Sequence, residues 1–130
     1  MSEESVDVIL YSADSAKRQL IMEGTGRRPG RNTPTINWIE TATPAGVVKA
    51  VEDKKPAIMV LDAETPKVGG MAVAKQVQNE LDFAPLLVLL TARPQDAWLA
   101  KWADAAFTIL APYDPLELQE TMTEALKWVE

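Results

Sequence analysis

The chain has 130 residues, of which 47% are hydrophobic, and this suits one domain with a core of its own. Its net charge of −6 argues against broad electrostatic attraction to nucleic acid or to an anionic membrane. Because it contains no cysteine and no histidine, disulfide bonds, thiolate chemistry, phosphohistidine and His-based metal sites are excluded.

Apolar runs alternate with stretches of helical period from one end of the chain to the other. Strands are expected, in order, at residues 6–11, 36–40, 58–62, 86–90 and 106–110. Helices are expected at residues 15–23, from 44 to about 55, around 73–81, at 94–103 and from 114 to the end. The segment 24–34 is too rich in glycine, proline and arginine for regular structure, so it predicts a long exposed loop. Thr43 and Pro44 have the residue types of an N-cap and a first helical position.

The third predicted strand places one carboxylate where an apolar run stops. Residues 58–61 are apolar throughout, which is typical of a parallel strand covered on both faces, and Asp62 ends the run. Gly69 and Gly70 then indicate a turn into the next helix. Ligands bind at the carboxyl edge of open α/β sheets, so Asp62 is a candidate nucleophile toward phosphoryl groups.

Five strands alternating with five helices predict an α/β fold, a parallel sheet with helices on both faces. Right-handed crossovers leave few topologies, and the flavodoxin-like strand order 2-1-3-4-5 is the leading one. We expect residues 1–130 to form a single domain.

Several motifs, taken in their order and spacing, resemble the receiver domain of bacterial two-component response regulators. They are Arg18 in the first helix, Asp62 with Pro66 and Gly70, Thr91 with Ala92, and the segment 112–118. The resemblance covers nearly the whole chain. It implies that Asp62 is the phosphoacceptor and that the Thr91 hydroxyl contacts the phosphoryl group.

The sequence departs from this pattern where the family holds Mg²⁺ and the phosphoryl group. Ser12 and Ala13 stand in place of the family's metal-binding acidic pair, and Ala111 stands in place of its lysine. The family's aromatic switch position is Thr108, and Phe107 is expected on the other face of the strand. These departures predict a divergent pseudo-receiver, degenerate in Mg²⁺-dependent phosphoacceptor chemistry.

Other carboxylates lie near enough in sequence to form a rearranged Mg²⁺ site with Asp62. Asp14 is one candidate, with an N-cap of the first helix as its alternative role. Glu64 is the other, with an exposed loop position as its alternative. Lys67 is the nearby amine that would have to replace the missing lysine.

Five residues are predicted to form an interaction surface. They are Trp98, Trp102, Thr108, Tyr113 and Trp128. Paired tryptophans are typical binding anchors, and the resemblance implies a partner or homodimer face built from the fourth helix, the fifth strand and the fifth helix. The arginines of the predicted 24–34 loop have two readings, a solvated loop or a site for an anion or partner.

We therefore expect a stand-alone, cytoplasmic, receiver-like domain with no output domain, which acts in phosphorelay signalling through protein contacts. It would be no enzyme, require no cofactor, and bind neither nucleic acid nor membrane; the resemblance implies a histidine kinase as a partner. One alternative is a phosphoaccepting regulator with Asp62 as acceptor and a rearranged metal site. The other is a flavodoxin-like small-ligand binder, which ranks last because no strand leads into a phosphate-cradling loop.

Overall fold

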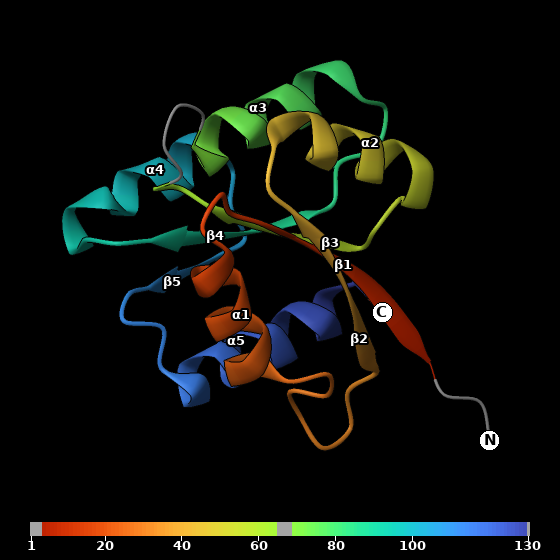
Figure 1. Cartoon of the computed structure of the whole chain (residues 1–130), viewed down its shortest axis with the longest axis vertical. Helices are drawn as coiled ribbons and strands as arrows, with labels where there is room; N and C mark the ends of the chain where they lie inside the picture. Colours follow the sequence, from red (N-terminus) through yellow and green to blue (C-terminus); the bar gives the residue numbers. More distant parts are fainter. Residues whose placement is uncertain (1–3, 65–68, 130) are drawn as a thin grey trace.

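The computed structural model describes residues 4–64 and 69–129 and shows a five-stranded parallel sheet in the order β2-β1-β3-β4-β5 (Figure 1). The predicted α/β class and strand order are confirmed. The strands are β1 (Ser5–Tyr11), β2 (Thr35–Thr41), β3 (Ile58–Asp62), β4 (Leu86–Thr91) and β5 (Phe107–Leu110). The helices are α1 (Ser15–Thr25), α2 (Pro44–Lys54), α3 (Gly70–Glu80), α4 (Ala97–Trp102) and α5 (Pro115–Trp128), with a short 3-10 helix at Pro94–Asp96. Pro66 and Lys67, named in the sequence analysis, lie outside the described residues.

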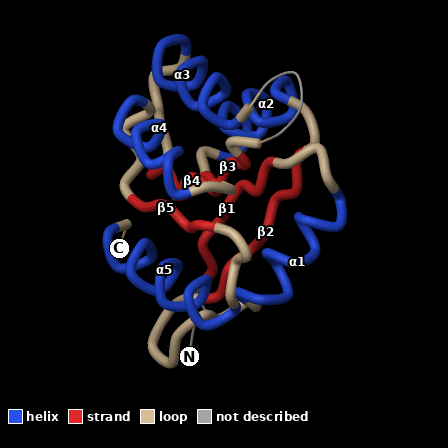
Figure 2. The backbone as a smooth tube through the Cα atoms, turned by 90° about the vertical axis from the view of Figure 1, so that its left-hand side faces the viewer, coloured by secondary structure: helices blue, strands red, loops and turns tan. Residues whose placement is uncertain are grey.

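Helices cover both faces of the sheet, which explains why its central strands are apolar throughout. Helices α1 and α5 lie on one face, and α2, α3 and α4 lie on the other (Figures 1 and 2). Side chains alternate between the two layers, so that Val8 packs on the α1 and α5 side while its neighbour Ile9 packs on the opposite side. All five residues of β3 are buried, Asp62 among them.

Three helix boundaries differ from the prediction. Helix α1 continues through Gly24 to Thr25 and ends at Gly26, whose positive φ of 76° is a conformation that glycine adopts readily and whose amide donates to the carbonyl of Met22. Helix α3 stops at Glu80, since the backbone of Leu81 is extended. The predicted helix at 94–103 is split into the 3-10 turn Pro94–Asp96 and the short helix α4.

Helix starts follow the capping residues in the sequence. The Thr43 hydroxyl accepts a hydrogen bond from the amide of Gly46, with Pro44 at the first helical position, as predicted. Asp114 caps α5 in the same way, through the amide of Glu117. Residues 26–34 of the predicted 24–34 loop lie outside regular structure, while Gly24 and Thr25 belong to α1, and Arg27, Arg28 and Arg31 are exposed on the loop.

The start of α3 is packed tightly on the end of β3, which requires glycine at position 70. A Cβ atom on Gly70 would lie 2.8 Å from Cβ of Leu61 and 2.9 Å from the carbonyl oxygen of Asp62. Gly70 therefore sets how closely α3 approaches Asp62 at the end of β3. Within the described residues, no helix has the length and apolar character needed to cross a membrane.

Candidate functional site

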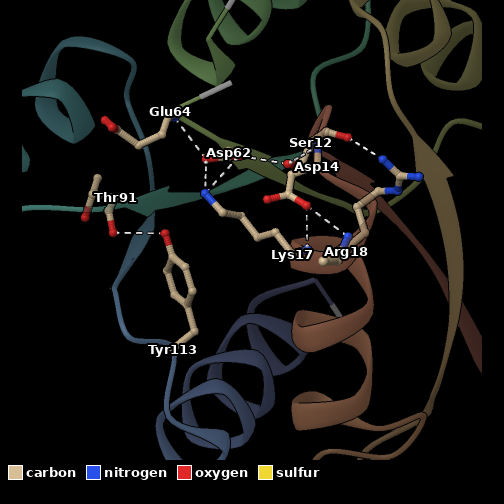
Figure 3. A network of polar contacts seen from close by, with 9 residues as sticks. Ser12, Asp14, Lys17, Arg18, Asp62, Glu64, Thr91 and Tyr113 are labelled. Atoms are coloured by element: carbon tan, nitrogen blue, oxygen red, sulfur yellow. Dashed lines mark hydrogen bonds and ion pairs between the residues drawn. The ribbon is translucent and has the colours of Figure 1, made fainter. Parts of the chain in front are cut away.

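Asp62 lies at the carboxyl edge of the sheet and is only 2% exposed. Its Oδ2 accepts a hydrogen bond of 2.8 Å from the Ser12 hydroxyl, and its Oδ1 accepts one of 2.9 Å from the amide of Glu64. The ammonium of Lys17 lies 3.2 Å from Oδ1 and 3.1 Å from Oδ2 (Figure 3). The predicted central carboxylate is thus present, buried, and held by donors from three segments of the chain.

Ser12 follows directly after β1, where the resembled family carries its acidic pair. It is buried, its amide donates to the carbonyl of Thr41, and its hydroxyl also accepts from the amide of Asp14. The adjacent Ala13 is exposed. The position next to Asp62 therefore offers a neutral hydroxyl instead of a second carboxylate.

Lys17, on the first turn of α1, was missed by the sequence analysis. Its ammonium bridges both oxygens of Asp62 and lies 5.8 Å from the centre of the Tyr113 ring. The sequence did contain a pattern that places Lys17 near the sheet edge. Asp14 has the residue type of an N-cap, and the residue three positions after a cap lies on the first turn of the helix. The replacement amine at Asp62 thus comes from α1, while Lys67 lies outside the described residues.

Asp14 is the N-cap of α1. Its Oδ1 accepts hydrogen bonds from the amides of Ala16 and Lys17, at 2.9 and 3.2 Å, which confirms the capping interpretation. Glu64 contacts Asp62 through its backbone amide, while its exposed side chain extends away from the Asp62 carboxylate (Figure 3).

The donor set around Asp62 does not fit Mg²⁺, which prefers an octahedral shell of oxygen ligands. Both oxygens of the Asp62 carboxylate contact an ammonium group. Over residues 4–64 and 69–129 the structure contains no group of three acidic side chains placed to hold a metal ion.

Thr91 ends β4 beside the site, as expected, and is 4% exposed. Its carbonyl accepts a hydrogen bond of 3.1 Å from the Tyr113 hydroxyl. The prediction that Tyr113 belongs to an exposed surface is wrong, because the residue is 5% exposed and its ring packs in the core under α5. Burial, together with the charges of Asp62 and Glu64, raises the pKa of Tyr113 to about 12.

Arg18 and Arg93 hold the loops on either side of Asp62. The Arg18 guanidinium donates to the carbonyl of Ser12 at 2.6 Å and to Glu40 at 3.1 Å. Arg93, which sequence reasoning missed, makes a two-pronged contact with the buried carboxylate of Asp96 at 3.1 and 2.8 Å. This contact raises the pKa of Arg93 and fixes the loop that leads from Thr91 into α4.

The other predicted surface residues are exposed. Trp98, Trp102 and Trp128 are 61%, 49% and 64% exposed, and Thr108 is exposed on β5. Phe107 lies on the opposite face of β5, as predicted, and meets Trp128 edge to face. The Lys75 ammonium lies 4.8 Å from the Trp102 ring centre. A pocket of about 830 Å³ is lined by residues that include Lys75, Phe83 and Trp128.

The chain is similar to known proteins over almost its full length. It is 32% identical over 126 residues to an uncharacterized response regulatory protein of Mycobacterium tuberculosis, covering 97% of this chain and 95% of that protein; the sequences from two strains match equally. No protein-family model matches the chain.

Solved structures agree on the fold. A two-component response regulator of the LuxR family from Aurantimonas superposes with a TM-score of 0.79 at 20% identity, over 96% of this chain and 87% of that one. A CheY-like receiver domain protein from Methanospirillum hungatei gives 0.73 at 18% identity, over 95% of each chain. The fold is thus that of a receiver domain. With the mycobacterial relative, this places the chain in the response regulators, the proteins of two-component signalling.

Proposed function

We propose that this receiver domain signals through protein contacts and has lost efficient Mg²⁺-dependent phosphorylation of Asp62. The observation that carries the proposal is the set of donors on that carboxylate. Asp62 is buried beneath an ammonium and a hydroxyl, at the place where the chemistry of the resembled family calls for oxygen ligands to a divalent cation.

The charge balance of the site supports the same proposal. An aspartate that attacks a phosphoryl group needs positive charge between two approaching anions. Here the acidic pair is replaced by Ser12 and Ala13, and the lysine before Pro112 by Ala111. Among the described residues, the ammonium of Lys17 contacts both oxygens of this nucleophile and offsets its negative charge.

Phosphorylation is tested by intact-mass measurement after incubation with Mg²⁺ and acetyl phosphate. We expect no mass increase in the native protein within the time that a typical receiver domain is converted. The Asp62→Asn variant is the control, because it removes the acceptor and preserves the shape of the side chain. A phosphoryl adduct that forms readily on the native chain, requires Mg²⁺ and is absent from the control would defeat the proposal.

The contact surface that we propose consists of Trp98, Trp102, Thr108 and Trp128. The tryptophans are large, exposed and rigid, as binding anchors usually are. They belong to α4 and α5, which flank the edge strand β5. We propose that this surface binds a protein partner, for which a histidine kinase and a second copy of the chain are the two candidates.

Size-exclusion chromatography with light scattering tests the homodimer, and capture of a kinase from cell extract tests the alternative. We expect the Trp98→Ala/Trp102→Ala double variant to lose the interaction and keep its fold. Leu20→Ala is a matched control, because Leu20 is a 48% exposed apolar residue on α1, which lies on the face of the sheet opposite α4 (Figures 1 and 2). Equal binding by the native chain and the tryptophan variant would show that the interface lies elsewhere.

A further inference from the structure

We propose that Lys17 is a tethered cation that takes the place of a bound metal ion at Asp62 and joins this carboxylate to Tyr113. This inference deepens the proposed function, because it names the group that occupies the site. It rests on the contacts of one ammonium with two neighbours at the carboxyl edge of the sheet, Asp62 and Tyr113.

The geometry makes Lys17 the counterion of Asp62. Its ammonium lies within 3.2 Å of both carboxylate oxygens, so that it bridges them as one cation. The Asp62 side chain is 2% exposed and that of Lys17 is 21% exposed, so the pair is only partly screened by water. A carboxylate buried to this extent is costly without an opposite charge, and α1 delivers that charge from its first turn.

The position of the amine is set by the helix cap. The Asp14 carboxylate accepts a hydrogen bond from the amide of Lys17, which fixes the backbone of the first turn. The side chain of Arg18, the next residue, donates to the carbonyl of Ser12. The Lys17 side chain then extends from this anchored turn to Asp62 (Figure 3). The cation is therefore supplied by the fold itself and needs no solute at any concentration.

The same ammonium connects Asp62 to a second strand end. It lies 5.8 Å from the centre of the Tyr113 ring, and the Tyr113 hydroxyl donates to the carbonyl of Thr91. The contacts thus run from β3 through α1 to the turn before α5 and on to the end of β4. The link between Asp62 and Tyr113 in this path is Lys17. Position 108 on β5, the aromatic switch position of the resembled family, carries an exposed threonine.

A thermodynamic cycle of thermal unfolding, in buffer free of any phosphoryl donor, tests the pairing. Lys17→Met removes the charge and keeps most of the side-chain stem, so we expect the melting temperature to fall by about 5–10 °C. Adding Asp62→Asn to this variant removes the buried anion, and we expect at least half of the loss to be recovered. Additive losses, with no recovery in the double variant, would overturn the inference.

Amine labelling gives a second measurement, which is made on the folded protein and does not depend on thermal unfolding. The native protein is treated briefly with acetic anhydride, and the modification of each lysine is read by peptide mass spectrometry. We expect Lys17 to react several-fold more slowly than Lys49, whose side chain is 80% exposed, and to speed up in Asp62→Asn while Lys49 stays unchanged. If Asp62→Asn left the Lys17 rate unchanged, Asp62 would not hold the amine.

Magnesium provides the third arm. Millimolar Mg²⁺ should leave the melting temperature of the native protein unchanged, and a rise that Asp62→Asn abolishes would show that a metal displaces the amine. These readouts are separate from the phosphorylation test. A ready phosphoryl adduct would defeat the proposed function and leave the pairing intact, while additive losses in the cycle would defeat the pairing alone.

Discussion

The Ser12 hydroxyl donates a hydrogen bond of 2.8 Å to Oδ2 of Asp62, so that the ends of β1 and β3 meet through a neutral donor and an anion. A second carboxylate at position 12 would face the first at close range and repel it. The side chain at position 12 is therefore one of the groups that determine whether the edge of the sheet attracts a divalent cation.

Installing an acidic pair with Ser12→Asp and Ala13→Asp should make the stability of the protein depend on Mg²⁺. Without metal, we expect a loss of about 1–3 kcal/mol from repulsion between carboxylates. With metal, stability should rise by about 1.4 kcal/mol for each tenfold excess over the dissociation constant. Urea unfolding with EDTA and with Mg²⁺ measures both. The same pair in an Asp62→Asn background should respond much less, and equal responses would place the metal away from Asp62.

Tyr113 predicts a dependence of stability on alkaline pH. Its pKa is about 12 in the folded protein, above the unfolded value of about 10, so folding favours the protonated phenol. Its contribution is fully present below pH 10 and is lost as the pH rises toward 12. The difference in unfolding free energy between the native protein and Tyr113→Phe should therefore shrink over this range. Absorbance of the tyrosinate, as a difference between the two proteins, locates the titration independently, and a midpoint near pH 10 would contradict the expected burial.

The ion pair between Arg93 and Asp96 should stabilise the turn that leads into α4. Arg93→Met leaves a 3% exposed carboxylate without its two-pronged donor, and we expect this variant to unfold at a lower urea concentration than the native protein. Arg31→Met, on the exposed loop between α1 and β2, is the control and should change stability by less than about 0.5 kcal/mol. Similar losses in the two variants would mean that the ion pair contributes nothing specific.

Gly70→Ala should push α3 away from the end of β3. The added methyl group would lie 2.8–2.9 Å from the side chain of Leu61 and the carbonyl of Asp62, and we expect a loss of about 1–3 kcal/mol. Gly46→Ala, in the first turn of α2, is the matched control, because its nearest contact would be 3.1 Å, from the Thr43 hydroxyl. Thermal unfolding compares the two, and a stable Gly70→Ala protein would show that the helix start can move.

Local sequence patterns were enough to predict the architecture. The apolar runs of the sheet and the cap at Thr43 are consequences of alternation, burial and hydrogen bonding within a few residues. Asp62 and Thr91 were placed at the correct edge for the same reason, since each stands where an apolar strand stops.

The contacts of the site were harder to predict, because they join residues far apart in the chain. Lys17 reaches Asp62 across 45 residues, and a lysine on the first turn of a helix ordinarily reads as a solvated charge. The hydroxyl of Tyr113 reaches Thr91 across 22 residues, and its turn takes a φ of 55° that is uncommon for tyrosine, so the ring points inward instead of onto the surface. Only the assembled sheet edge shows these pairings.

Helices α1 and α5 touch where Gly24 faces Leu118, and a Cβ atom on the glycine would lie 2.6 Å from a methyl group of that leucine. Lys17 lies seven residues earlier on α1, about 10 Å along the helix axis, while Tyr113 lies just before α5 begins. The packing of the two helices at Gly24 therefore helps to set the distance between the Lys17 ammonium and the Tyr113 ring. A larger side chain at position 24 would push the helices apart and lengthen this distance without altering any polar residue.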